Sequence, residues 1–152
     1  MPRIKKEVTQ KYIPSVGRRR EAVARVRLYP EAKNGVMLGD QIVKKGEIFV
    51  NKRPIDNYFT DSVEKATYLE PFRATNTLGK FAMTIMVAGG GKAGQLAAVI
   101  HGIARALSTY DSEKYRKILK KKGLLRRDAR TRERRKVGMG GKARRKKQSP
   151  KR

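Results

Sequence analysis

A glycine-rich run, Gly89-Gly90-Gly91-Lys92-Ala93-Gly94-Gln95, is the part of this 152-residue sequence whose spacing points most directly to chemistry. It follows an apolar segment and precedes residues 96–107, in which apolar side chains recur at helical spacing. Backbone amides at the start of a helix bind anions, and Lys92 adds a positive charge there. We therefore predict a phosphate-facing loop that consists of Gly89, Gly90, Gly91, Gly94 and Gln95.

The same glycines match two nucleotide-binding patterns. G-x-G-x-x-G is satisfied, but residues 110–115 predict another helix, not the strand that should carry a ribose-binding acid. The P-loop spacing also fits, yet Gln95-Leu96 stands where Lys and Ser or Thr are required. The phosphate of an RNA backbone is the favoured ligand. The alternatives are glycines that serve only a tight turn, and a nucleotide-binding enzyme.

Positive charge favours the RNA interpretation. The chain has 39 Lys and Arg against 13 Asp and Glu, a net charge of +26 that indicates a polyanionic partner. Residues 1–113 have 19 basic and 11 acidic side chains, a net of +8, whereas residues 114–152 have 20 basic and two acidic ones, a net of +18. After Arg126 too few apolar side chains remain to offset the entropy of ordering. We expect a basic tail that becomes ordered on its partner.

The residue inventory excludes several classes of protein. Without Cys there can be no disulfide, thiolate metal site or cysteine nucleophile. The single histidine, His101, has no evident nucleophile or orienting acid beside it. We predict no catalytic residue, metal site, cofactor or small-molecule substrate. With no apolar run near the roughly 20 residues that span a bilayer, and no signal peptide, we expect a soluble, intracellular chain without a membrane partner.

The elements that must position the loop are those of an α+β domain. Residues 22–29 alternate apolar and basic side chains, which predicts a strand with one buried face and one basic face. Further strands are predicted over residues 36–38, 47–51 and 81–87, the last in a hairpin with 72–77. Helices are predicted over residues 55–59, 96–107 and from 110 onward. Another should begin at a cap, Thr60 or Asp61, and end at Leu69 because of Pro71.

Several of these motifs together resemble one family. The glycine run, continued through Ala98, Gly102 and Ala104-Arg105-Ala106-Leu107, is similar to the signature of small-subunit ribosomal protein nine. Three later segments resemble the bacterial-type tail of that family: Arg126-Arg127-Asp128-Ala129-Arg130, residues 133–138 and residues 142–145. Residues 17–26, 48–51 and 58–59 are similar to its earlier segments. The resemblance covers about residues 16–152.

The resemblance implies a two-layer α+β sandwich, a mostly antiparallel sheet with helices on one face, similar to the second domain of ribosomal protein five. A long extended basic C-terminal tail completes it. The expected divisions are an N-terminal extension (1–15), a globular RNA-binding domain (16–122) and a polybasic tail (123–152). The implied role is a structural constituent of the small subunit, not an enzyme. It would lie in a cytoplasmic ribosome, with an organelle ribosome as the alternative.

The implied partners are the 3′ major domain of the small-subunit ribosomal RNA in the subunit head, the neighbouring head proteins, and the anticodon stem-loop of P-site tRNA. Carried over by position, the tRNA-binding pair is Lys151 and Arg152. The main alternative is a free nucleic-acid-compacting protein of histone-tail type. The side chains expected to bind ribosomal RNA are Arg18, Arg19, Arg20, Arg25, Lys92, Arg105, Arg126, Arg127, Arg130, Arg132, Arg134, Arg135, Lys136, Lys142, Arg144 and Arg145.

Overall fold

A computed structural model of the chain describes residues 11–32, 35–39 and 41–137. Its strands are β1 (Ile13–Arg19), β2 (Ala22–Tyr29), β3 (Val36–Leu38), β4 (Gln41–Val43), β5 (Ile48–Val50), β6 (Arg53–Pro54) and β7 (Ala82–Ala88). Its helices are α1 (Ile55–Tyr58), α2 (Ser62–Thr75), α3 (Lys92–Tyr110) and α4 (Ser112–Lys121). The main sheet has the order β1-β2-β7-β5-β6, and β3 and β4 form a separate hairpin.

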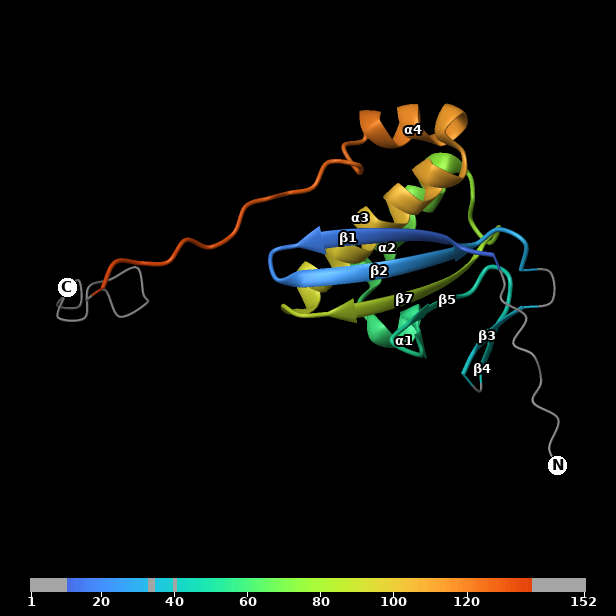
Figure 1. Cartoon of the computed structure of the whole chain (residues 1–152), viewed down its shortest axis with the longest axis horizontal. Helices are drawn as coiled ribbons and strands as arrows, with labels where there is room; N and C mark the ends of the chain where they lie inside the picture. The colour runs from blue at the N-terminus through green and yellow to red at the C-terminus, as the bar shows by residue number, and fades with distance from the viewer. Residues whose placement is uncertain (1–10, 33–34, 40, 138–152) are drawn as a thin grey trace.

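The sheet is mostly antiparallel, as predicted, because only β5 and β7 pair in parallel. Helices α2 and α3 lie behind it in Figure 1, and α4 lies beyond the β1 edge. β1 begins at Ile13, so the sheet includes the last residues of the segment expected to be an N-terminal extension. No helix in the described ranges is long and apolar enough to cross a membrane.

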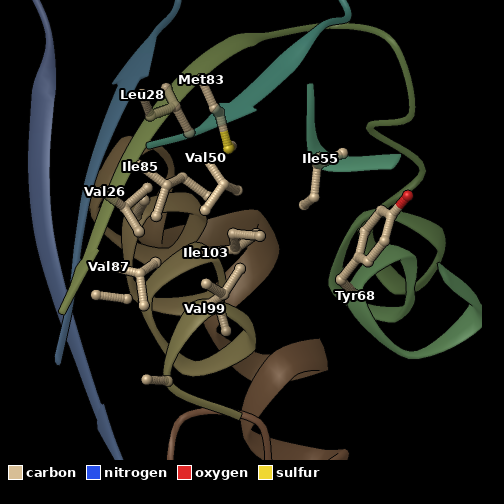
Figure 2. Close-up of a cluster of buried hydrophobic side chains, with 14 of the residues drawn as sticks. Val26, Leu28, Val50, Ile55, Tyr68, Met83, Ile85, Val87, Val99 and Ile103 are labelled. Carbon is tan, nitrogen blue, oxygen red and sulfur yellow. The ribbon is translucent and has the colours of Figure 1, made fainter. Parts of the chain in front are cut away.

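Alternation along β2 and β7 builds the core. Val26 pairs with Ile85 and Leu28 with Met83, and all four side chains are buried. Figure 2 shows them directed toward Val99 and Ile103 of α3, with Ile55 and Tyr68 beyond. Arg25 and Arg27, which alternate with them, are exposed on the opposite face of the sheet. The prediction of one buried and one basic face for residues 22–29 is confirmed.

Two glycines allow α3 to lie against β1. A Cβ atom on Gly17 would lie 1.8 Å from the Ala98 carbonyl oxygen. One on Gly102 would lie 3.2 Å from the Gly17 amide nitrogen and 2.7 Å from Val26 Cγ2 of β2. The Ser15 hydroxyl donates a hydrogen bond of 2.9 Å to the Gly102 carbonyl. The backbones of β1 and α3 therefore meet directly at Gly17 and Gly102.

The predicted end of α2 and the predicted hairpin are wrong. Asp61 caps α2 as expected, but the helix continues through Pro71 to Thr75 and ends at Asn76, whose φ is 51°. Pro71, Phe72 and Thr75 are all buried, so tertiary packing retains the last turn despite the hydrogen bond that proline cannot donate. Residues 72–75 are therefore helical, and β7 pairs with β2 and β5 instead.

The chain after α4 first packs back on the domain. The Leu124 amide donates to the Leu119 carbonyl at 3.1 Å, and Leu124 and Leu125 pack against the core. Residues 127–136 then have no regular secondary structure and lead away from the body (Figure 1). The second half of the predicted basic tail, residues 138–152, lies outside the described residues.

Candidate nucleic-acid interface

Two glycines of the predicted loop are required by the backbone. Gly89 and Gly90 have φ values of 74° and 62°, and a Cβ atom on Gly89 would lie 2.3 Å from the Glu21 carbonyl oxygen. Gly91 has a φ of −108°, with no heavy atom within 4 Å of a Cβ atom built on it. A tight turn thus explains Gly89 and Gly90 but not Gly91, which leaves the backbone at the start of α3 open.

The first turn of α3 presents backbone donors. Gly91 is the N-cap, no side chain caps the helix, and the first turn has no acidic residue. The first helical hydrogen bond runs from the Gln95 amide to the Gly91 carbonyl at 2.9 Å, so the amides of residues 92–94 precede it. Lys92 is exposed beside them. This combination of amides, helix dipole and one positive charge suits a phosphate oxygen.

The side chain of Gln95 holds this loop in place. Its Nε2 donates to the Gly89 carbonyl at 3.1 Å, and its Oε1 accepts from the Tyr58 hydroxyl at 2.8 Å. Asn51 holds the end of β7, just before the loop, in the same way. Its side-chain amide bonds the Val87 amide at 2.8 Å and the Val87 carbonyl at 3.0 Å. Sequence reasoning placed Gln95 among the phosphate-facing residues, whereas these contacts make it a positioning residue for the loop.

The β1–β2 turn lies beside the loop and brings the three consecutive arginines with it. A Cβ atom on Gly94 would lie 3.6 Å from the Ala22 Cβ and 3.7 Å from the Arg19 carbonyl oxygen. Arg18 and Arg20 are exposed, whereas Arg19 is turned toward the domain and its side chain is 16% exposed. In Figure 1 this turn and the end of β7 lie at the same end of the sheet.

Arg19 binds the first residues after the α4 turn. Its Nη2 lies 2.9 Å from Asp128 Oδ2, and its Nη1 donates to the Arg130 carbonyl at 2.6 Å. Arg130 also pairs with Asp128, at 2.7 Å between Nη2 and Oδ2. Hydrogen bonds from Arg130, with a smaller effect of Arg19, hold the pKa of Asp128 well below its usual range. We call these three residues the clasp.

Three distant segments therefore converge on one end of the domain, which we call the basic end. It consists of Arg18, Arg20, the loop of residues 89–94 with Lys92, and Arg126, Arg127 and Arg130. An open cleft of about 290 Å³ runs between the first and last of these segments, with Arg18, Arg126 and His101 in its lining. The sequence predicted these residue types, and the structure brings them together.

His101 fits a structural role. Its Nδ1 is buried without a hydrogen-bond partner among the described residues. Burial lowers its pKa, a hydrogen bond with the Leu125 backbone opposes that shift, and Arg105 and Arg127 lower it further. In the described part of the chain no group of three potential metal ligands is found. A neutral imidazole among arginines has no partner there for acid–base or metal chemistry.

The topology argues against a dinucleotide enzyme. α4 follows α3 directly, as predicted, and the Asp111 carboxylate accepts from the Lys114 amide at 3.1 Å as its N-cap. No parallel strand follows the glycine loop in the described residues, so Asp111 is not placed as a ribose-binding acid. The cap explains the acid at this position.

Two further predicted residues lie away from the basic end. Arg25 is exposed on the outer sheet face, and Arg105 donates to the Val16 carbonyl at the edge strand. Exposed positions along residues 131–137 carry Arg132, Arg134, Arg135 and Lys136. The remaining predicted residues, Lys142, Arg144, Arg145, Lys151 and Arg152, lie outside the described residues. The helix α4 was predicted, but its exposed basic residues were not among the predicted site residues: Arg116, Lys117, Lys120 and Lys121.

The fold and this site define a class of protein: a basic α+β domain with exposed Arg and Lys side chains beside a loop of open backbone amides. Comparison with known proteins narrows the class. The family model for Ribosomal protein S9/S16 matches residues 17–152. The chain belongs to this family, and membership in a family of ribosomal proteins confirms the resemblance and the prediction that the chain is not an enzyme.

Individual relatives agree with the family model. The chain is 43% identical over 127 residues to the small ribosomal subunit protein uS9 of Anaeromyxobacter sp. (strain K), covering 84% of this chain and 87% of the relative. It is 45% identical over 127 residues to the protein of the same name from Maridesulfovibrio salexigens, with the same coverage. The match to that of Dehalococcoides mccartyi (strain CBDB1) is 45% over 128 residues, covering 84% and 86%.

Proposed function

We propose that this chain is a structural protein of the small ribosomal subunit in cytoplasmic ribosomes, and that its basic end binds the ribosomal RNA of the subunit head, in the 3′ major domain. Neighbouring ribosomal proteins of the head are its further partners. The observation that carries the proposal is the convergence of the β1–β2 turn, the glycine loop and the clasp. Arg18, Arg20 and Lys92 contact phosphates around the amides of residues 92–94.

The chemistry of the basic end favours phosphate over bases. Guanidinium groups and backbone amides match phosphate oxygens, and such contacts carry no sequence code. Specificity then comes from the shape of the RNA, read by the fixed spacing between loop, turn and clasp. Arg25 on the outer sheet face and Arg105 at the β1 edge extend the contact along the domain. Arg126 and Arg127 continue it toward the tail.

The C-terminal tail has a second task in this proposal. Residues 130–145 follow the ribosomal RNA through their basic side chains, and Lys151 and Arg152 contact the anticodon stem-loop of P-site tRNA. The chain length permits it, because the segment after Val137 spans roughly 50 Å when extended at about 3.3 Å per residue. The +18 charge of residues 114–152 supports the same assignment.

Reconstitution tests the ribosomal assignment. The purified chain is mixed with full-length small-subunit ribosomal RNA and, separately, with duplex DNA of equal length, and both are probed by nuclease footprinting. One stoichiometric protected region on the RNA is expected. Dispersed protection of equal strength on RNA and DNA would instead support the free nucleic-acid-compacting alternative.

The tRNA contact needs its own experiment. Small subunits reconstituted with a chain lacking Lys151 and Arg152 should assemble normally but release P-site tRNA faster. Lys146→Gln/Lys147→Gln removes the same charge a few residues earlier and is the matched control, expected to change tRNA release less. An unchanged release rate in the deletion variant would remove the tRNA contact from the proposal and leave the RNA contact standing.

A further inference from the structure

The exposed side of α4 is basic and is not used by the proposed function. Over residues 112–122 the chain has six basic side chains and one acidic one, Glu113. Leu119 is fully buried and Tyr115 half-buried, and these two fix which side of the helix faces the domain. Arg116, Lys117, Lys120 and Lys121 are all exposed. We call these four residues the α4 face.

The positive charges of the α4 face are not neutralised by the ion pairs found within the described part of the domain. Lys114 pairs with Asp111 at 3.3 Å and Lys122 with Glu70 at 3.7 Å. Among the described residues no carboxylate lies within ion-pair distance of the four side chains of the α4 face. Arg116 and Lys120, and likewise Lys117 and Lys121, are like charges at i,i+4, an arrangement that destabilises a helix. An external anion removes this repulsion.

We propose that the α4 face is a second RNA-binding surface, which docks on the phosphate backbone of a double-helical segment of the ribosomal RNA. The inference rests on the proposed function only for the identity of the RNA. The four cations form two rows along a rigid helix, and the two members of each row are four residues, about 6 Å along the helix axis, apart. The face has no aromatic or amide side chain that could stack on bases or read their edges, so shape and charge remain as the means of recognition.

An acidic protein is the competing partner, and the composition of the face disfavours it. Protein interfaces bury apolar and aromatic side chains at their centre and are depleted in lysine. Three of the four residues of the α4 face are lysines, and the apolar side chain beside them is Ile118, 41% exposed. Phosphate neutralisation needs only charge, which this face supplies.

The α4 face is separate from the glycine loop of the basic end, whereas Arg126 and Arg127 follow α4 closely in the chain. The glycine loop precedes the first residue of α3, and α4 begins after its last. The 19 residues of α3 put about 28 Å between those two points. In Figure 1, α4 lies beyond the β1 edge, on the opposite side of the domain from the β3–β4 hairpin. Two such surfaces on one rigid body fix the angle between two RNA helices, which one surface alone does not.

The salt dependence of binding to full-length small-subunit ribosomal RNA tests the α4 face. Arg116→Gln/Lys117→Gln/Lys120→Gln/Lys121→Gln should reduce the slope of log Kd against log salt by about 3, since each phosphate contact contributes about 0.7–0.9. The control, Lys44→Gln/Lys45→Gln/Lys52→Gln/Lys80→Gln, removes the same charge from exposed positions elsewhere and should reduce it by less than 1. Circular dichroism checks that both variants fold. Equal slopes for the two variants would overturn the inference.

Directed probing identifies the partner. Because the chain has no Cys, Lys117→Cys gives a single attachment site for an iron chelate that cleaves nearby RNA backbone. Cuts on both strands of one RNA helix are expected in reconstituted subunits, and none at that helix from Met37→Cys on the distant hairpin. Absence of RNA cuts from residue 117, with cleavage of a protein instead, would assign the α4 face to an acidic protein. If wild type itself binds no defined region of the RNA, the proposed function fails first.

Discussion

The Arg19 guanidinium, at the end of the first strand, lies 2.9 Å from the carboxylate of Asp128, just beyond the last helix. Arg19 also donates to the Arg130 carbonyl, so the side chain and the backbone of the later segment are both held. Asp128 is one of two acids in residues 114–152. In a segment built of positive charge, this acid fixes the point and direction from which the basic chain leaves the domain.

Asp128→Asn should release this segment. The amide retains its shape but loses the charge that draws in Arg19 and Arg130, so the backbone of residues 129–130 should become more mobile on the nanosecond timescale. Heteronuclear ¹H–¹⁵N relaxation measures this directly. Glu133→Gln removes the other acid and is the matched control, expected to leave residues 129–130 unchanged. Identical relaxation in wild type and Asp128→Asn would mean that the clasp does not order the segment.

Gly17→Ala should destabilise the fold strongly. The added methyl group would overlap the Ala98 carbonyl at 1.8 Å and force β1 away from α3. We expect a loss of about 3 kcal/mol or more in the free energy of unfolding, measured with urea. Gly91→Ala is the control, because open space surrounds that position, and it should cost less than about 1 kcal/mol. Equal costs at the two positions would contradict the close packing.

Stability should depend on the protonation of His101. Burial lowers its pKa below the ordinary 6.5, so between these two values the unfolded chain binds more protons than the folded one. The free energy of unfolding should therefore fall as the pH drops through 6.5 and level off below the folded pKa. Urea unfolding between about pH 5 and 8 measures the slope. His101→Gln should flatten the dependence of the free energy of unfolding on pH. If the variant retained the full slope, a group other than His101 would be its cause.

The Tyr68 hydroxyl should matter more than the surface charge beside it. It donates to Asp56 at 2.7 Å, and the residue Tyr68 is 1% exposed. Burial, then Asp56, raises its pKa above the usual range, so it is the donor at neutral pH. Tyr68→Phe should cost about 1–2 kcal/mol in urea unfolding. Lys65→Gln, which removes the exposed partner at 2.8 Å, should cost under about 0.5 kcal/mol, and the reverse order would refute this account.

Much of this fold follows from local patterns. The alternation in residues 22–29 repeats every two residues, and the apolar spacing after Gly94 repeats at the helical period of about 3.6 residues. Each pattern is local, and both elements form as predicted. The predicted stop at Pro71 failed because the burial of Phe72 and Thr75 outweighs the lost hydrogen bond, a tertiary effect that spacing does not encode. The hairpin failed for the same reason, because the strand expected at 72–77 is a helical turn.

The site was predictable in its residue types but not in its geometry. Charge and glycine spacing selected Arg18, Lys92 and the loop. The pairing of Arg19 with Asp128 joins two segments far apart in the sequence, so neither charge nor spacing could predict it. Gln95 was assigned to phosphate, although its contacts with Tyr58 and Gly89 turn it inward. The α4 face had a usable signal, because a helical projection of residues 112–121 separates Leu119 from four cations.

The most direct test of the account removes the charges of the basic end. Arg18→Gln/Arg20→Gln/Lys92→Gln changes three exposed side chains that no core contact uses. On full-length small-subunit ribosomal RNA, the slope of log Kd against log salt should fall by about 2–3, with the protected region weakened around one site. A slope, affinity and footprint equal to those of wild type would show that ribosomal RNA does not bind where the turn, the glycine loop and the clasp converge.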